Sequence, residues 1–285
     1  MAPVVEAQDL GYVYMPGTPL EQRALQGVSF AIEAGECVGL IGPTGCGKST
    51  LISHLNGLLR PTEGRLTVLG RDVGNTRDLR SLRFEVGLVF QSPEAQLFEE
   101  TVFAEIAYGP RNMRLPAADI EGRVVRAAAL LGLDLDALRQ RSPLTLSGGE
   151  QRRVAMASIL SMEPTVLIFD EPTAGLDPEG RALCLAAIQD LIRNGRTLVV
   201  VSHDLELIAA LASRVLVLEG GRLAWNGDLR AALRAGLPGL RPTPAGRLCQ
   251  ALSAAGWAVP GDVVTVPEAS EAIIAALREQ PVTDL

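Results

Sequence analysis

The sequence predicts an α/β fold built on a parallel sheet, and three features of the chain support this prediction. Residues 42–49 match the pattern G-x-x-x-x-G-K-[ST], between the apolar run 37–41 and a stretch with helical spacing of apolar residues. Three later apolar runs are continuous, which is typical of strands buried on both faces of a sheet. A long stretch with helical periodicity separates the first of these runs from the second. With 285 residues, the chain has the length of one large domain plus a smaller region.

The N-terminal segment predicts a small antiparallel β layer. Residues 4–8 and 28–32 have β-like composition, and residues 15–19 between them are rich in turn formers. After the glycine-rich pattern, residues 49–59 carry apolar side chains at helical spacing. The order strand, glycine-rich loop, helix is therefore expected around residue 42.

The glycine-rich segment is a predicted phosphate-binding loop. Glycines let the backbone fold so that successive N–H groups face the phosphates, and the start of the following helix adds its positive dipole end. We expect Lys48 to reach the β and γ phosphates and Ser49 to hold Mg²⁺. The expected nucleotide-binding residues of this segment are Gly42, Pro43, Thr44, Gly45, Cys46, Gly47, Lys48, Ser49 and Thr50. A purely structural glycine turn is the alternative, and the strand before and helix after the loop disfavour it.

Each of the three later apolar runs ends in polar residues. Runs 86–90, 166–169 and 198–201 are followed by Gln91, by Asp170 with Glu171, and by Ser202 with His203. Ligands of open α/β sheets lie at the carboxyl ends of the strands. We expect Asp170 to support Mg²⁺ and Glu171 to orient or deprotonate the attacking water, although acids at strand ends also occur as turn or cap residues. His203 is expected near the γ phosphate, whereas His54 is interpreted as structural.

Residues 93–164 predict a helical subdomain inserted into the sheet domain. Apolar residues between 120 and 131 share one helical face after an expected Asp119 cap. Ser147 and Glu150 form an S-x-x-E capping box before the helical run 152–160, so a well-capped helix is one interpretation. Gly148 and Gly149 leave the amide groups of that helix start uncovered, which makes a second anion site the other interpretation.

The C-terminal part of the chain predicts a hairpin, a linker and an accessory region. Residues 215–218 and 223–225 predict a hairpin that closes the sheet. Residues 237–244 are rich in proline and glycine and predict a linker. The helical runs 245–255 and 270–278 form the small region that follows.

Composition excludes several classes of function. The chain is 47% hydrophobic and 4% aromatic, with a net charge of −7. This acidic balance repels polyphosphate backbones, so no nucleic-acid partner is expected. No apolar stretch approaches the roughly 20 residues that a transmembrane helix needs, and the N-terminus lacks a basic region followed by an apolar one, so we expect a soluble, cytosolic chain.

The sequence predicts that its four cysteines are reduced thiols. Cys37, Cys46, Cys184 and Cys249 lack C-x-x-C spacing and histidine companions, which disfavours a zinc site or a disulfide framework. Cys46 is close to Lys48 and to a helix N-terminus, which both favour a thiolate that ATP would protect from alkylation. An inert small residue is the alternative.

The ordered set of motifs resembles that of ATP-binding cassette (ABC) ATPases over about residues 4–228. The matching segments are the phosphate-binding loop, Gln91, Leu146-Ser-Gly-Gly-Glu-Gln151, Asp170-Glu171, Ala174-Gly-Leu-Asp177 and His203. The resemblance implies a P-loop NTPase core and two cassettes closed head to tail. Each ATP then lies between the phosphate-binding loop of one cassette and the Leu-Ser-Gly-Gly motif of the other.

The same resemblance implies roles for further residues. Tyr14 would stack on adenine, Gln91 would sense Mg²⁺ and water, and Asp177 would communicate across the dimer. Tyr12 is a rival to Tyr14, and either ring could instead pack in the β layer. Glu150 takes a position where glutamine is common in the family.

A narrower resemblance is to the ATPase subunits of energy-coupling factor (ECF) importers, particularly the second of their two paralogous ATPases. It rests on residues 14–20, 89–98 and 163–181. It implies a sister ATPase in a heterodimer, with a homodimer left open, a transmembrane coupling subunit that docks near Gln91, and a membrane-embedded substrate-binding component. The chain would then lie at the cytoplasmic face of the cell membrane and drive uptake of a vitamin or a transition-metal ion.

These resemblances give the expected domains. An ABC ATPase domain is expected at residues 1–236, with its helical subdomain at about 93–164. Residues 237–285 are expected to form an accessory region that serves ATPase dimerisation.

Other classes of ABC protein remain as alternatives. A DNA-repair or chromosome-structure ATPase would carry a long heptad coiled coil between Lys48 and Asp170, and a translation factor would carry two tandem cassettes; the sequence has neither. The ATPase of another transporter type is a further alternative. A regulatory subunit without turnover is disfavoured because Lys48, Asp170, Glu171 and His203 are all present.

Overall fold

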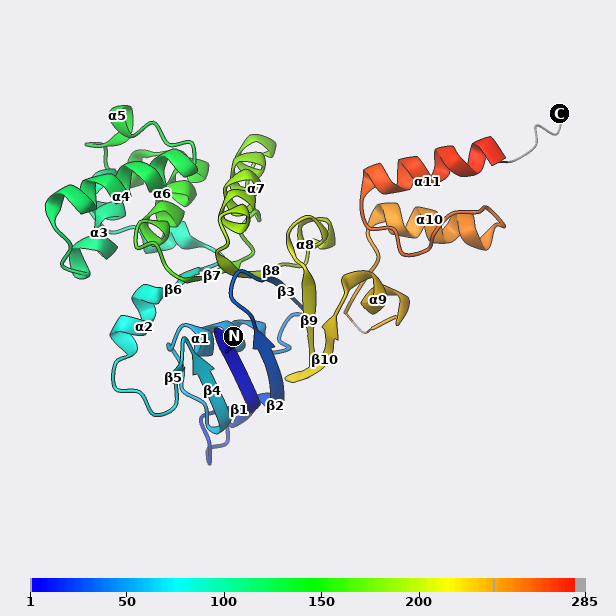
Figure 1. The fold of residues 1–285 in the computed structure, drawn as a ribbon, viewed down its shortest axis with the longest axis horizontal. Coiled ribbons are helices and arrows are strands. Elements are labelled where there is room, and N and C mark those ends of the chain that lie inside the picture. The colour runs from blue at the N-terminus through cyan, green and yellow to red at the C-terminus, as the bar shows by residue number, and fades with distance from the viewer. Residues whose placement is uncertain (1, 238, 280–285) are drawn as a thin grey trace.

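Two β-sheets and the helices around them make up the fold (Figure 1). The computed structural model describes residues 2–237 and 239–279. Met1 of the expected ATPase domain, and residues 238 and 280–285 of the expected accessory region, lie outside the described residues.

The central sheet has the strand order β10-β9-β3-β8-β7-β6. Its strands are β3 (Cys37–Ile41), β6 (Val86–Val89), β7 (Val166–Asp170), β8 (Thr197–Val201), β9 (Arg214–Glu219) and β10 (Arg222–Gly227). The strands from β6 to β9 pair in parallel, and β10 pairs antiparallel with β9. The predicted parallel strands and the closing hairpin are therefore confirmed.

Both faces of the central sheet are covered, which explains its continuous apolar runs. Along β7, Leu167 and Phe169 join one hydrophobic cluster while Val166 and Ile168 join the other. The second cluster also contains Leu51 and other residues of α1 (Lys48–Leu55) together with residues of the N-terminal sheet. Helix α1 thus lies between the two sheets, and every side chain of β7 except its final acid is buried.

The N-terminal sheet is antiparallel, as predicted, but its strands are longer than expected. It contains β1 (Val5–Tyr14), β2 (Gln22–Ile32), β4 (Glu63–Val68) and β5 (Arg71–Asp72) in the order β2-β1-β4-β5. The register of β1 against β2 shifts between Ala7 and Leu10, and Asp9 there has a φ of 48°. This bulge interrupts the alternation of buried and exposed side chains, so the sequence pattern stops before the strand does.

Helix α1 is shorter than predicted. The helix ends at Leu55 rather than at residue 59. Gly57 follows with a φ of 69°, and the amides of Leu58 and Leu59 both donate to the carbonyl of Ser53. A glycine in the left-handed region closes the helix although the apolar pattern continues.

The helical subdomain is confirmed between β6 and β7. Its elements are the 3₁₀ turns η1 (Pro93–Gln96) and η2 (Pro143–Thr145) and the helices α3 (Val102–Asn112), α4 (Ala117–Leu130), α5 (Leu135–Leu138) and α6 (Gly148–Leu160). The expected Asp119 cap of α4 is wrong. The residue at the cap is Pro116, and Asp119 lies in the first turn, where its charge still suits the helix dipole.

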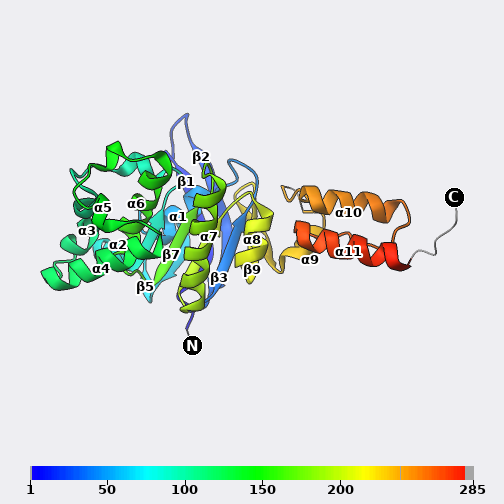
Figure 2. The same cartoon turned by 90° about the horizontal axis from the view of Figure 1, so that it is seen from above.

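The remaining helices flank the sheet and extend the chain beyond it. They are α2 (Leu79–Glu85), α7 (Pro178–Arg193), α8 (Leu205–Leu211), α9 (Leu229–Arg234), α10 (Pro244–Ala254) and α11 (Val266–Glu279). Helices α10 and α11 lie together at the end of the molecule opposite the helical subdomain in both views (Figures 1 and 2). They share a small cluster that includes Cys249, Val263 and Ala276.

Contacts from α9 and from the connecting segment join this hairpin to the main body. The Arg230 guanidinium of α9 lies 2.5 Å from the Glu268 carboxylate of α11. In the connecting segment, Leu240 belongs to the main core, and Gly239 lies so close to Pro43 that an added Cβ would come within 2.6 Å of its ring. In residues 2–237 and 239–279, none of the helices is both long enough and apolar enough to cross a membrane.

Candidate functional site

A cavity of about 410 Å³ lies at the carboxyl ends of the parallel strands. Its lining residues are Tyr14, Gln22, Ala24, Gly42, Thr44, Gly45, Gly47, Lys48, Ser49, Thr50, Gln91, Asp170, Glu171 and His203. We call it the loop cavity. It brings together the phosphate-binding pattern and the polar residues that follow β6, β7 and β8, as the strand-end argument predicted.

Backbone contacts explain the glycines of the loop. Gly47 has a φ of 107° and precedes the first residue of α1, and a Cβ there would lie 2.6 Å from the carbonyl oxygen of Ala24. At Gly42, with a φ of 152°, it would lie 2.2 Å from the carbonyl oxygen of Leu218. Both positions therefore exclude any side chain. The Lys48 ammonium donates to the carbonyls of Gly42 and Pro43, at 2.7 and 3.0 Å, and lies over the loop.

Two residues of the predicted loop do not line the cavity. Pro43 contacts the connecting segment at Gly239 instead. Cys46 is 5% exposed, with its sulfur beneath Gly42. Burial raises the pKa of the Cys46 thiol by more than Lys48 lowers it. The expected thiolate at Cys46 is therefore wrong, and the alternative of an inert small residue holds.

Asp170 ends β7, Glu171 follows it directly, and the two side chains differ in surroundings. Burial and the neighbouring Glu171 raise the pKa of Asp170, and Lys48 partly opposes this shift. The Glu171 carboxylate accepts hydrogen bonds from the Ser202 hydroxyl at 3.0 Å and the His203 amide at 3.0 Å, and it lies 2.8 Å from His203 Nδ1. The strand-end residues of β7 and β8 thus form one connected group.

The backbone of Glu171 is strained. Its φ is 51°, in the left-handed region that an ordinary side chain occupies at a cost of about 1–3 kcal/mol. The Glu171 amide donates to the Val201 carbonyl at 2.9 Å, which ties the residue to the end of β8. Strain of this kind requires that the surroundings hold the residue in place.

The donor set of the loop cavity suits Mg²⁺. Ser49, Gln91 and Asp170 all line it and carry a hydroxyl, an amide and a carboxylate group, and Mg²⁺ prefers a few protein oxygens together with phosphate and water. Among the described residues, no cluster of three or more His, Cys, Asp and Glu side chains could hold a metal. A site with one acid, one hydroxyl and one amide is consistent with a metal that arrives with a phosphate ligand.

Only one of the two candidate tyrosines lines the loop cavity. Tyr14 lines the loop cavity and is 37% exposed, whereas Tyr12 is half-buried and outside it. The Tyr12 ring meets Tyr14 edge-on at 4.8 Å between centroids, and it meets the His54 ring at 4.7 Å. The Tyr14 hydroxyl also lies 3.2 Å from the Thr50 hydroxyl. These contacts position the Tyr14 ring over the edge of the phosphate-binding loop.

His54 is the buried end of this aromatic row. It is fully buried, and its Nδ1 lies 2.7 Å from the Thr50 carbonyl oxygen. Burial lowers the pKa of its imidazole. A neutral ring that packs and donates to a helix carbonyl agrees with the structural interpretation of His54.

A second cavity, of about 450 Å³, lies at the start of α6. Its lining residues are Ser147, Gly149, Glu150, Arg153, Gly175, Leu176, Asp177, Glu179 and Gly180, and we call it the signature hollow. The predicted capping box is present, because Ser147 and Glu150 bond reciprocally. A Cβ on Gly148 or Gly149 would meet nothing within 4 Å, so this helix start is open to a ligand or partner.

The two cavities share no lining residue. Lys48 and Glu171 line the loop cavity, whereas Ser147 and Asp177 line the signature hollow. Asp177 caps α7 by accepting from the Gly180 amide at 2.8 Å. One chain therefore carries two separate cavities, the arrangement that the expected head-to-tail pair of cassettes would require.

Sequence reasoning missed several residues of the site. Gln22 and Ala24, from the start of β2, line the loop cavity without any signal in the pattern. The sequence places Ser202 beside His203, but it does not show that the Ser202 hydroxyl donates a hydrogen bond to Glu171. Arg152 is 7% exposed and shares the buried face of α6 with Met156. A charged residue at apolar helical spacing was the signal that could have identified it.

Comparisons with known proteins agree with this geometry. The family model described as ABC transporter matches residues 25–174. The energy-coupling factor transporter ATP-binding protein EcfA2 of Symbiobacterium thermophilum is 51% identical over 271 residues, covering 93% of each chain. EcfA2 of Clostridium perfringens is 42% identical over 280 residues, covering 96% of this chain and 98% of that one.

Solved structures show the same fold. CbiO1 from Clostridium perfringens, described as part of the ABC transporter complex cbiONQ, matches with a TM-score of 0.72 at 34% identity, over 83% of this chain and 92% of that one. A dimeric structure of the ATP-binding cassette MJ0796, in a post-hydrolysis state bound to ADP and Pi, matches with a TM-score of 0.71 at 27% identity, over 79% and 98%.

The fold is that of an ATP-binding cassette, and the family model and the relatives show that the chain belongs to the ABC transporter family. Within this family it is the ATP-binding subunit of an energy-coupling factor importer, an ATPase whose activity is coupled to transport. The expected fold class and activity are confirmed. The non-transport alternatives are set aside.

Proposed function

We propose that this chain is the motor that, with a sister ATPase, drives uptake of a vitamin or a transition-metal ion. A transmembrane coupling subunit and a membrane substrate-binding component would complete the importer, and the chain would lie at the cytoplasmic face of the membrane. The relatives named EcfA2 and the cbiONQ component support this assembly. The observation that carries the proposal is the separation of the loop cavity from the signature hollow.

The loop cavity holds the proposed hydrolysis site. Lys48 and the amides of the glycine loop would bind the phosphates, and Tyr14 would stack on adenine. Mg²⁺ held by Ser49, Gln91 and Asp170 would neutralise charge on the phosphate oxygens.

Glu171 is the proposed general base. Its carboxylate is held by Ser202 and His203, which would orient it toward the attacking water. His203 would reach the γ phosphate from the end of β8.

The signature hollow is the proposed contribution to the nucleotide on the sister subunit. The Ser147 amide already donates to the Glu150 carboxylate, so the open amides of this helix start are those of Gly148 and Gly149, which would favour an anion. Asp177 would communicate between the subunits. Because a triphosphate would contact these groups only in the closed pair, its binding would favour closure, and hydrolysis would remove the bridging phosphate.

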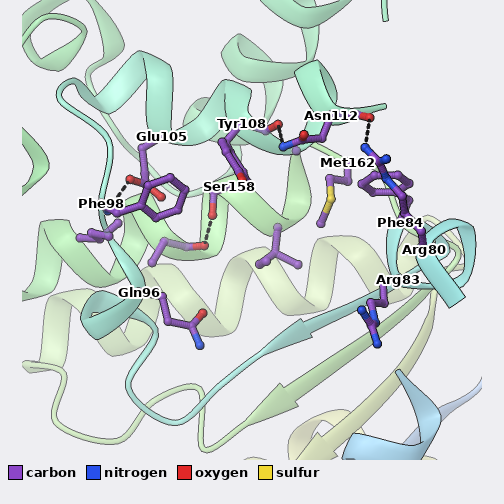
Figure 3. Close-up of a pocket in the computed structure, with 14 residues that line it drawn as sticks. Arg80, Arg83, Phe84, Gln96, Phe98, Glu105, Tyr108, Asn112, Ser158 and Met162 are labelled. Carbon is purple, nitrogen blue, oxygen red and sulfur yellow. Dashed lines mark hydrogen bonds between the residues drawn. The ribbon is translucent and has the colours of Figure 1, made fainter. Parts of the chain in front are cut away.

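A groove beside the helical subdomain is the proposed docking site of the coupling subunit (Figure 3). Its volume is about 400 Å³, and Gln96, Leu97 and Phe98, which closely follow Gln91, form one of its walls. Phe98 is 62% exposed and packs edge-on against Tyr108 at 4.8 Å. Arg80 and Arg83 lie at the other side. We propose an amphipathic helix of the coupling subunit as its occupant.

The C-terminal hairpin is the proposed second contact with the sister ATPase. We propose the ATPase domain at residues 1–236 and the accessory region from residue 237. Exposed apolar side chains on α10 and α11 would meet the sister subunit. They are Leu248, Val266, Ile274 and Leu277.

The Glu171→Gln variant tests the proposed function in the complete importer, assembled with the sister ATPase and membrane subunits. We expect phosphate release at this chain's site to fall by about 10²–10³-fold, because the general base is lost. ATP affinity should stay within about threefold, because the loop and Tyr14 are intact. Glu219→Gln, an acid at the end of β9 and outside both cavities, is the matched control and should hydrolyse normally. Near-normal hydrolysis by Glu171→Gln would refute the role of Glu171.

A further inference from the structure

One buried arginine connects the two half-sites. Arg152, on the second turn of α6, donates three hydrogen bonds to backbone carbonyls. The acceptors are the carbonyl oxygens of Ala174 at 2.6 Å, Glu171 at 2.8 Å and Gln91 at 2.9 Å. The residue is 7% exposed, so these carbonyls replace water as partners of its charge.

The three carbonyls belong to three functional segments. Gln91 follows β6 and leads into η1, which lines the docking groove. Glu171 directly follows β7 and lines the loop cavity. Ala174 lies in the segment that continues to Asp177, at the edge of the signature hollow. Helix α6 itself begins in the signature hollow and lines the docking groove farther along.

One of the three acceptors of Arg152, the carbonyl of Glu171, belongs to a residue with a strained backbone. Glu171 is in the left-handed region, and its amide is already held by Val201. Arg152 holds the carbonyl on the other side of the same residue. Both peptide groups that flank the Glu171 side chain are therefore fixed, and the direction of its carboxylate depends on both.

An arginine suits this position for a geometric reason. A guanidinium is planar, always charged and carries five N–H donors, so one side chain can serve three carbonyls in different directions. A lysine ammonium on a flexible stem cannot reproduce this arrangement, and a glutamine can serve fewer acceptors.

We propose that Arg152 is a positioning residue that holds the hydrolysis group of this chain's own site in register with the signature helix that serves the other nucleotide. The inference rests on the proposed function, because it assumes that Glu171 and Ser147 act at different nucleotides. Movement of α6 when a nucleotide or the coupling subunit engages it would be passed through Arg152 to Gln91, Glu171 and Ala174.

The test compares Arg152→Gln and Arg152→Lys with wild type in the complete importer. We expect kcat to fall at least about tenfold in both variants, while the Kd for Mg-ATP stays within about twofold, because the residues of the phosphate-binding loop are unchanged. A merely structural role would weaken ATP binding, thermal stability and kcat together. Arg152→Lys keeps the positive charge, so the same measurements can be made on it if the Arg152→Gln variant does not fold.

Hydrogen exchange of the full-length chain gives the second readout. Residues 91–97 and 171–176 should both exchange faster in the variants, whereas the sheet core should not. Arg60→Gln is the matched control, because Arg60 also donates to two loop carbonyls, those of Gly74 and Thr76, at 2.9 Å each. It should leave kcat and the exchange of both segments unchanged.

Three outcomes would overturn the inference while leaving the proposed function intact, provided that Glu171→Gln abolishes turnover in the same preparation. They are a kcat within twofold of wild type, a parallel loss of ATP affinity, and faster exchange in only one of the two segments. If Glu171→Gln itself turns over normally, the proposed function fails first.

Discussion

Tyr14 shows how a single ring is positioned at the loop cavity, the proposed nucleotide site. Its hydroxyl contacts Thr50 of the phosphate-binding loop, and its ring packs against Tyr12, which packs in turn against the buried His54. The row extends from His54, on the buried side of α1, to Tyr14 at the loop cavity. Because both ends of Tyr14 are held, its exposed face is available for stacking at little cost in side-chain entropy.

The Tyr14→Ala variant should weaken the binding of ATP but not the binding of inorganic tripolyphosphate. Base stacking on an aromatic ring contributes about 1–3 kcal/mol, so the Kd for ATP should rise about tenfold. Tyr14→Phe, which keeps the ring and loses the hydroxyl contact, should bind ATP within about twofold of wild type. Calorimetric titration with both ligands measures this. Equal losses for ATP and tripolyphosphate would mean that the loop, and not the base contact, had changed.

Gly47 and Gly45 make a matched pair for the loop backbone. Both have positive φ, but a Cβ would overlap the Ala24 carbonyl at Gly47 and would meet nothing within 4 Å at Gly45. Gly45→Ala should cost about 1 kcal/mol of stability from its backbone conformation alone, and Gly47→Ala about 2 kcal/mol more. Urea denaturation compares them. Equal losses would show that the overlap at Gly47 is relieved without cost.

At the residue scale, the sequence predicted most of the site. The loop, Gln91, Asp170, Glu171 and His203 could be placed together because each follows an apolar run at the same sheet edge. The exposure of Cys46 could not be predicted, since it depends on the close approach of Gly42. The contacts of Arg152 join segments about 20 and 60 residues away in the chain, which no local pattern encodes.

At the scale of elements, Arg214 connects its own strand, β9, to two other strands and a turn. It donates to Glu36, at the turn before β3, at 2.5 and 3.2 Å, and also to the Ala31 carbonyl of β2 and to Asn226 of β10. Burial alone would raise the pKa of Glu36, but hydrogen bonds from Arg214 and from the Glu33 amide outweigh it, so its pKa lies below its ordinary value.

This pair predicts a pH-dependent loss of stability. Because the folded-state pKa of Glu36 is depressed, its stabilising effect is present above its ordinary pKa and is lost as pH falls through the folded pKa. Arg214→Gln should therefore reduce the free energy of unfolding by about 2 kcal/mol at pH 7, and by less when Glu36 is protonated in acid.

Urea denaturation at pH 7 and at low pH measures this difference. Arg193→Gln is the control, because Arg193 forms an exposed pair with Asp190 and should cost less than about 0.5 kcal/mol at either pH. A loss that does not depend on pH would contradict the assignment to Glu36.

Element boundaries show where sequence patterns fail. The strands of the central sheet were predicted to within a residue or two because burial on both faces makes their runs continuous. Helix α11 begins at Val266, four residues before the predicted run. Glu268 accepts from the Val264 and Thr265 amides, which starts the helix early. This capping contact is visible in Thr265-Val-Pro-Glu268, but the apolar spacing does not contain it.

At the scale of the whole molecule, the helical subdomain determines how the half-sites are arranged. The subdomain is inserted between β6 and β7, and its helix α6 lies apart from α1, the helix that begins at Lys48 (Figure 1). The order of motifs predicted that two half-sites exist. Their separation within one chain follows from tertiary packing, which the order alone does not fix.

The central claim is that ATP lies between two cassettes, each of which supplies half of its site. The most direct measurement is sedimentation of the Glu171→Gln chain mixed with its sister ATPase, with and without Mg-ATP. The account predicts a one-to-one complex that is stabilised by Mg-ATP, and a weaker complex when Ser147→Phe fills the signature hollow. Sedimentation as separate monomers at saturating Mg-ATP would contradict it.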